Sequence, residues 1–226
     1  MNDLREMVLC IPGPWQSRAE AIRALVDAHG GRYLMAGLLL YDSEGKDSVT
    51  IEWEEHDPRM VNAFYCCQND EKTMSALASH GSVLYLRFPM DITDQRERLL
   101  KYTDVLRKAG GIAVKLESSG ISHPWSRWFE WLSSPFLHNH YRAAVIVAGD
   151  ADGWYSCGMH QFGLPGATVP GDGEEVRETL EAFNKYLLIE NPKLSTGHTF
   201  SKDADCGEFV TSHLGQASNC MGFGSQ

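Results

Sequence analysis

The chain has 226 residues, of which 43% are hydrophobic and 10% aromatic, so it can bury one large core or two small ones. Its 30 acidic and 20 basic residues give a formal net charge of −10, and the densest basic segment, residues 96–108, also contains acidic residues. Nucleic acids and anionic membranes require concentrated lysine and arginine, and crossing a bilayer takes roughly 20 apolar residues in a row, so neither kind of partner is expected.

Hydrophobic patterning in the first 90 residues predicts alternating strands and helices. Strands are expected at 7–11, 33–41, 49–55 and 83–88, and helices at 17–29 and 70–80. Ser17 can cap the first helix, and Gly30 and Gly31 end it. Residues 64–68 are ambiguous and fit a strand as well. The resulting order, βαββαβ, is typical of ferredoxin-like domains.

The pattern partly repeats after residue 90. We expect a helix at 93–108, then a second Gly-Gly pair and a strand at 112–117. The first helix is likewise followed by a Gly-Gly pair and a strand. This order indicates an internal duplication, with the alternative that glycine is simply favoured after helices. Further along, we expect a short helix from 123–124 to 134, a hairpin with strands 142–148 and 154–162, and a helix at 173–188.

These elements predict an α+β fold, with mixed or antiparallel sheets and helices packed on one face. A ferredoxin-like half is assigned to residues 1–90, a second, related α+β half to 91–202, and an irregular tail to 203–226. The six cysteines form no C-x-x-C pair and no repeated spacing, and the start of the chain is unlike a signal peptide. Together they favour a soluble cytoplasmic protein with buried or free thiols.

One group of polar residues is a candidate pocket. Lys115 and Glu117 share one face of a predicted strand that leads to His123, and polar side chains at a strand end commonly line a pocket. His160 and His198 would complete such a pocket. The alternative is a solvated sheet face, on which lysine and glutamate form an ion pair.

A second group could hold a metal ion. Cys157 and His160 are spaced C-x-x-H, and His198 and Cys206 could supply two further zinc ligands. In a regular strand, however, Cys157 and His160 point to opposite faces, and Ser156 lies about 13 Å from His160. We therefore expect a structural Cys157, no nucleophile–base pair and no cofactor.

Two further groups could form binding surfaces. Glu52, Glu54 and Glu55 give one predicted strand an acidic character, which fits a basic protein partner. Trp125, Trp128 and Trp131 recur every three residues and gather along one side of a helix. This aromatic face could bind a partner, or it could pack into the core.

Three runs of residues carry a family resemblance: WYSCGMHQFGLPG at 154–166, AGGIAVKLESSG at 109–120 and GHTFS at 197–201. Together they resemble the bacterial domain-of-unknown-function family 4261. The resemblance implies an α+β domain without known cofactor. It assigns no catalytic role to any residue, because that family has no established mechanism.

The leading hypothesis is a non-catalytic, acidic binding protein of the immunity type that covers a basic protein. One alternative is an enzyme of unrecognised class that uses the candidate pocket. Another is a structural module that forms a homo-oligomer.

Overall fold

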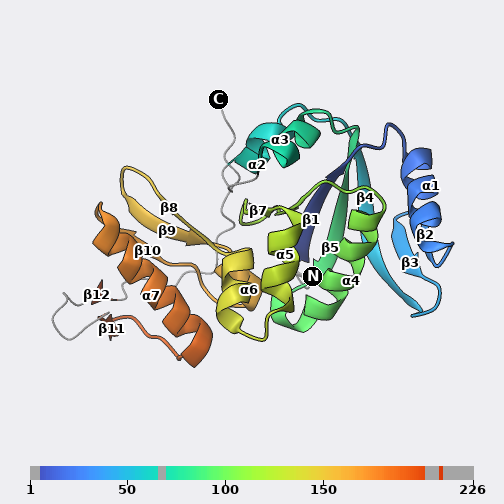
Figure 1. The fold of residues 1–226 in the computed structure, drawn as a ribbon. Helices are drawn as coiled ribbons and strands as arrows, with labels where there is room; N and C mark the ends of the chain where they lie inside the picture. The colour runs from blue at the N-terminus through green and yellow to red at the C-terminus, as the bar shows by residue number, and fades with distance from the viewer. Residues whose placement is uncertain (1–5, 66–69, 202–208, 211–226) are drawn as a thin grey trace.

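The computed structural model describes residues 6–65, 70–201 and 209–210 (Figure 1). It is an α+β structure built around a seven-stranded antiparallel sheet and a three-stranded sheet, which confirms the predicted fold class. The two sheets lie in different regions of the molecule, with α6 (Leu137–Ala144) between them (Figure 1).

The large sheet has the strand order β2-β3-β4-β5-β1-β6-β7. Its strands are β1 (Glu6–Gly13), β2 (Tyr33–Ala36), β3 (Leu39–Asp42), β4 (Asp47–Glu55), β5 (Ser82–Pro89), β6 (Val114–Leu116) and β7 (Ser122–His123). Every neighbouring pair is antiparallel, including the central pair β1 and β5. This sheet does not show the ferredoxin-like arrangement, whose βαβ units need parallel strands. Since β1 pairs with both β5 and β6, the predicted division at residue 90 passes through this sheet.

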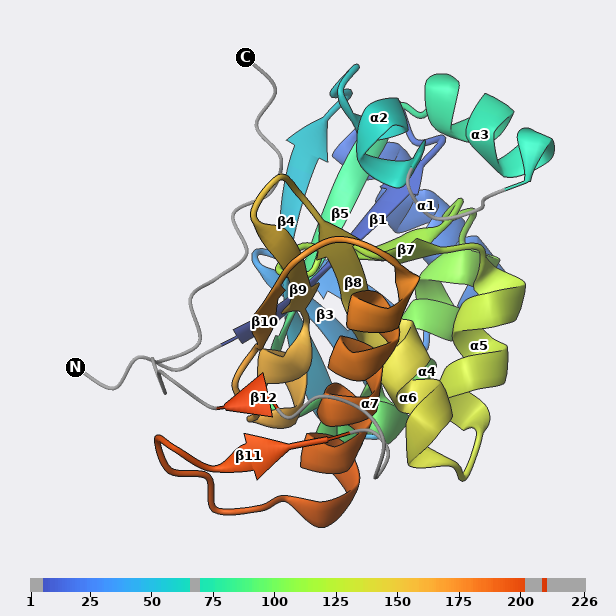
Figure 2. The same cartoon turned by 90° about the vertical axis from the view of Figure 1, so that its left-hand side faces the viewer.

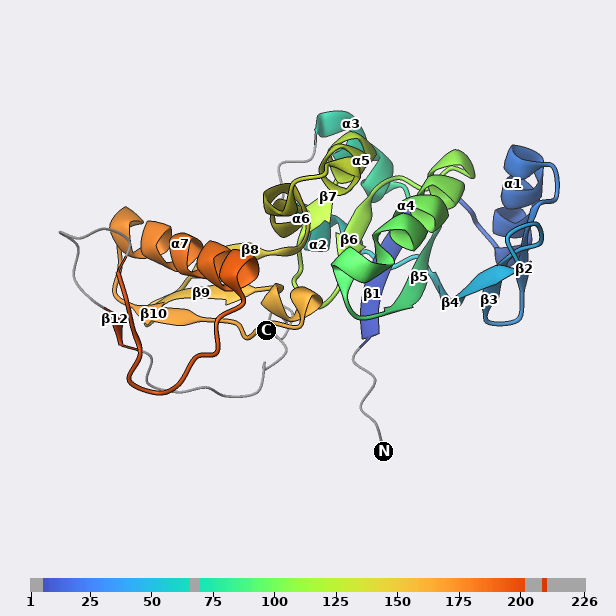
Figure 3. The same cartoon turned by 90° about the horizontal axis from the view of Figure 1, so that it is seen from below.

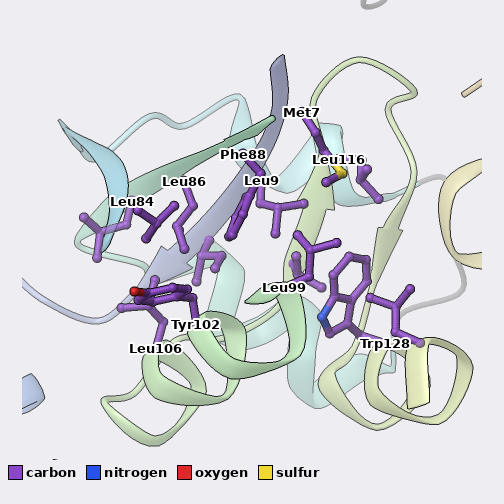
Figure 4. Close-up of a cluster of buried hydrophobic side chains, with 14 of the residues drawn as sticks. Met7, Leu9, Leu84, Leu86, Phe88, Leu99, Tyr102, Leu106, Leu116 and Trp128 are labelled. Carbon is purple, nitrogen blue, oxygen red and sulfur yellow. The ribbon is translucent and has the colours of Figure 1, made fainter. Parts of the chain in front are cut away.

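Helices cover one face of the large sheet. When the molecule is seen from below, α1 (Arg18–His29), α4 (Ile92–Lys108) and α5 (Trp125–Ser133) lie on the same side of the strands (Figure 3). Alternate strand residues such as Leu9, Leu86 and Leu116 point into the core beneath these helices, where they meet Tyr102 and Trp128 (Figure 4). We call the opposite side the open face; there α2 (Met60–Tyr65) and α3 (Glu71–Ala78) pack over only one part of the sheet.

The small sheet has the order β10-β9-β8. It consists of β8 (Ile146–Gly149), β9 (Gly153–Cys157) and β10 (Thr168–Pro170), and α7 (Glu174–Glu190) packs against it (Figure 2). The short 3₁₀ helix η1 (Met159–Phe162) follows β9, and β11 (Thr199–Phe200) and β12 (Phe209–Val210) pair beyond α7.

Three predicted elements differ from the structure. The strand at 33–41 is the hairpin β2–β3, because Gly37 takes a positive φ of 56° and turns the chain. The strand at 142–148 starts only at Ile146, since residues up to Ala144 belong to α6. The strand at 154–162 ends at Cys157. Gly158 has a φ of 113°, and a Cβ there would lie 2.1 Å from the Ala144 carbonyl oxygen, so the turn requires glycine.

Two further predictions concern helices and cysteines. Of the ambiguous residues 64–68, residues 64 and 65 end the helix α2, and 66–68 lie outside the described residues. The predicted tail, 203–226, also lies outside them, except for residues 209–210. Cys10 is a buried free thiol, but Cys157 is disulfide-bonded, which corrects the expectation of thiols alone. Among the described helices, none combines the length and the apolar character needed to cross a membrane.

Candidate functional site

The end of the small sheet nearest the start of α7 gathers carboxylates. Pro170 at the end of β10 pairs with Gly153 at the start of β9, so the β8–β9 turn and the loop that enters α7 lie at the same end of this sheet. We call this end the acidic tip; it contains Asp150, Asp152, Asp172, Glu174 and Glu175, all exposed.

Local backbone chemistry explains why these residues stand here. Asp150 accepts hydrogen bonds from the backbone N–H groups of Asp152 (2.9 Å) and Gly153 (3.2 Å), which closes the β8–β9 turn. Glu174 and Glu175 occupy the first turn of α7, where unpaired backbone N–H groups favour negative charge. The tip is therefore a consequence of one turn and one helix start.

Basic residues do little to neutralise the tip. No lysine or arginine occurs between Arg142 and Arg177 in the sequence. Arg177 hydrogen-bonds Glu174 with an Nε–Oε2 distance of 2.9 Å, and this contact lowers the pKa of Glu174. Asp152, Asp172 and Glu175 form no ion pair with any described residue. The acidic tip was not among the predicted sites, although the run without basic residues from 143 to 176 could have indicated it.

The candidate pocket is divided by the large sheet. Lys115 and Glu117 lie on the open face, joined by an ion pair of 2.9 Å. His123 pairs in register with Val114, and both are buried on the helix-covered side. Side chains that project from opposite faces of one sheet cannot line the same pocket. The alternative of an ion pair on a sheet face describes Lys115 and Glu117 better.

His123 is part of the core. It is 2% exposed and packs against the rings of Trp128 and Trp131, with centroid distances of 6.2 and 5.1 Å. Its Nε2 lies 2.9 Å from the Ala143 carbonyl oxygen, whereas Nδ1 has no hydrogen-bond partner among the described residues. Burial lowers the pKa of His123 to about 4, so the ring is neutral at pH 7.

His160 and His198 lie in two other places. His160 is buried in η1, where its Nε2 is 3.2 Å from the amide nitrogen of Gln161. His198 precedes β11 and lines a pocket of about 730 Å³ together with Phe183, Tyr186 and Phe200. β11 lies beside α7, where Phe200 packs against Phe183 and Tyr186, and it is apart from the strands of the large sheet (Figure 1). The five predicted pocket residues thus occupy four separate environments.

The metal candidates do not assemble either. Cys157 is disulfide-bonded, so its sulfur is not a thiolate ligand, and Cys206 lies outside the described residues. Within the described ranges, no group of three or more histidine, cysteine, aspartate or glutamate side chains could hold an ion. Because Gly158 ends the strand, the strand spacing predicted between Ser156 and His160 does not apply.

The predicted acidic strand keeps only part of its charge. Glu52 lies on the open face and accepts two hydrogen bonds from Arg87, at 2.9 and 3.0 Å, which lower its pKa. Glu54 and Glu55 are exposed at the end of β4. This strand therefore offers fewer uncompensated carboxylates than the acidic tip does.

The three tryptophans pack inward. Trp128 is fully buried, and its Nε1 donates a 3.0 Å hydrogen bond to Thr103 Oγ1. Trp125 and Trp131 are half-buried, and Trp125 donates to the Gly111 carbonyl at 2.6 Å. Core packing, the alternative to an aromatic binding face, accounts for these contacts.

Comparison with known proteins adds no relative. No protein-family model matches the chain, and no curated protein and no solved structure is significantly similar to it. The resemblance to family 4261 therefore stays a prediction.

Two of the three runs behind that resemblance meet in the structure. The Gln161 amide nitrogen of η1 donates a short hydrogen bond to Ser118 Oγ, which belongs to the loop after β6. Ser119 Oγ and Gln161 Oε1 are buried without a described partner. The contact joins the loop after β6 of the large sheet to η1, which connects β9 and β10 of the small sheet, and this gives the two runs a structural role.

Proposed function

We propose that this protein is a non-catalytic binding protein of the immunity type, and that it covers a basic protein partner with its acidic tip. The observation that carries the proposal is the set of five exposed carboxylates at one end of the small sheet, in a stretch without lysine or arginine. Opposite charge steers association and fixes the orientation of a complex.

The separation of the candidate pocket residues supports this function over an enzyme. Catalytic groups must act within hydrogen-bond reach of one substrate, and Lys115 and His123 point to opposite sides of one sheet. The acidic tip requires no such convergence. It requires only uncompensated charge on an accessible surface.

Photo-crosslinking in the native host can find the partner. A benzoylphenylalanine placed at Ala151, an exposed residue in the β8–β9 turn, should capture one basic protein, whereas the same probe at Ser75 on α3 should not. The partner would then be purified, and its dissociation constant measured by calorimetry. Capture of acidic proteins only, or equal capture from both positions, would refute the proposal.

A matched pair of triple variants tests the tip itself. The variant D152N/D172N/E175Q removes three exposed charges but keeps the turn bonds of Asp150 and the ion pair of Glu174. The control D27N/E54Q/E55Q makes the same change in net charge on other exposed residues. With exposed ion pairs contributing up to about 1 kcal/mol each, the tip variant should bind the partner at least about tenfold more weakly. An equal loss in the control would mean that the net charge of the chain, and not the acidic tip, determines the affinity.

A further inference from the structure

The hairpin β2–β3 at the outer edge of the large sheet exposes apolar side chains. Leu34, Leu38, Leu39 and Tyr41 are 42, 63, 44 and 36% exposed, and they are four of the seven large hydrophobic residues that are exposed in the described part of the chain. No charged residue occurs from 33 to 41. We call these nine residues the uncharged edge.

The exposed side chains form one patch. Leu34 pairs with Tyr41, and Ala36 pairs with Leu39, so these four residues are cross-strand neighbours on the open face. The alternate residues Met35 and Leu40 are buried under the helices on the other side. The hairpin therefore has its own core face and a second apolar face that no described element covers.

The backbone of β2 is also unpartnered on one side. Among the described strands, β2 pairs only with β3, and it is the last strand of the sheet. Natural edge strands commonly carry lysine, proline or a bulge that prevents pairing with another chain. The sequence of β2, Tyr-Leu-Met-Ala, contains no such residue.

We propose that the uncharged edge is a homodimer interface, in which β2 of one copy pairs antiparallel with β2 of a second copy. A two-fold axis perpendicular to the sheet at this edge continues the antiparallel order and places both apolar patches on the same side. The interface is isologous, so it closes with two copies. The opposite edge strand, β7, has only two residues and leads directly into α5.

Charge selects a second copy as the occupant. Two chains of net charge −10 repel each other, and they can approach most closely where the surface carries no carboxylate. The guanidinium of Arg18, which donates to the Gly37 carbonyl oxygen at the hairpin turn, adds no negative charge there. The flanking charges are compensated within the chain, because Arg32 binds Asp42 at 3.0 Å and Glu44 at 2.8 Å. A basic partner would find no carboxylate on this patch. The uncharged edge is thus independent of the acidic tip.

Sedimentation velocity across about 1–200 µM protein tests the dimer. The wild-type chain should reach twice the mass of one chain, and the amides of β2 should exchange hydrogen more slowly as the concentration rises. The variants L34K and L39K, which place an unpaired charge in the interface, should raise the dimer dissociation constant at least about a hundredfold.

F136K is the control, since Phe136 is 69% exposed at the start of α6, in another part of the molecule. It should dimerise like the wild type. Circular dichroism and thermal melting check that each variant folds. A monomeric wild type at 200 µM would overturn the proposal, and so would a dimer that survives both L34K and L39K or is lost equally in F136K.

Discussion

The uncharged edge and the acidic tip lie in the two regions of one acidic chain, yet they differ in almost every property. The edge has four exposed apolar side chains and no charge over nine residues. The tip has five exposed carboxylates in a stretch without lysine or arginine. The net charge of −10 is therefore a poor guide to either surface, because it is distributed unevenly. Each surface fits a different kind of partner.

The two sheets meet near Gly158, so a substitution there tests most severely whether they fold as one unit. At a φ of 113°, a Cβ at Gly158 would lie 2.1 Å from the Ala144 carbonyl oxygen at the junction after β9. We expect G158A to lower the free energy of unfolding by about 3–4 kcal/mol, because a strained backbone and a clash with main chain combine. Urea denaturation followed by tryptophan fluorescence would measure it.

Gly163 provides the matched control for that measurement. Its φ is 68°, but a Cβ there would contact nothing within 4 Å, so G163A should cost only about 1 kcal/mol. If G158A instead produces two separate unfolding transitions and the transition of the large sheet is unchanged, the large-sheet and small-sheet regions fold independently. Equal losses in both variants would show that the contact with Ala144 is unimportant.

Acid should act on the large-sheet region through His123. Its pKa is about 4 in the folded protein, against 6.5 as the ordinary value, so folding favours the neutral ring. The corresponding stability is complete above pH 6.5 and is lost as the pH falls toward 4. At pH 4 the loss reaches about 3 kcal/mol by proton linkage. The free energy of unfolding at a series of pH values between 7 and 4 measures this slope.

The variant H123Q isolates this histidine. It keeps an amide donor for the Ala143 carbonyl but cannot titrate, so its stability should be lower at pH 7 and should vary less between pH 6.5 and 4. A wild-type slope in H123Q would assign the acid sensitivity to other groups.

The sequence predicted most of the elements and the α+β class, because strand alternation and helix caps are local signals. Ser17 does accept a hydrogen bond from the backbone of Glu20, and Gly30 ends that helix at a φ of 60°. The all-antiparallel strand order could not be predicted, because it depends on β1 pairing with both β5 and β6 across the chain.

The candidate site was harder to predict than the elements. Lys115 and Glu117 were correctly assigned to one strand face, but their separation from His123 follows from the pairing of β6 with β7. The acidic tip depends on the register of β9 with β10, which brings residues 150–153 beside 171–175. Non-local pairing of this kind leaves no local sequence pattern, although the run without basic residues was visible.

Salt should have opposite effects on the two surfaces, tightening dimerisation and weakening partner binding, and both effects should be smaller than those above. Raising the ionic strength from about 20 to 300 mM shortens the Debye length and screens exposed charges. Two copies of a chain with charge −10 then repel each other less, so dimerisation through the uncharged edge should tighten severalfold. Binding of a basic partner at the acidic tip should weaken about tenfold over the same range, because the attraction is screened too. Sedimentation velocity measures dimerisation at both ionic strengths, and calorimetry measures partner binding. The variant D152N/D172N/E175Q should make partner binding less dependent on salt and leave dimerisation unchanged. A dimer that weakens with salt would mean that charge pairs hold it together, which the uncharged edge cannot supply.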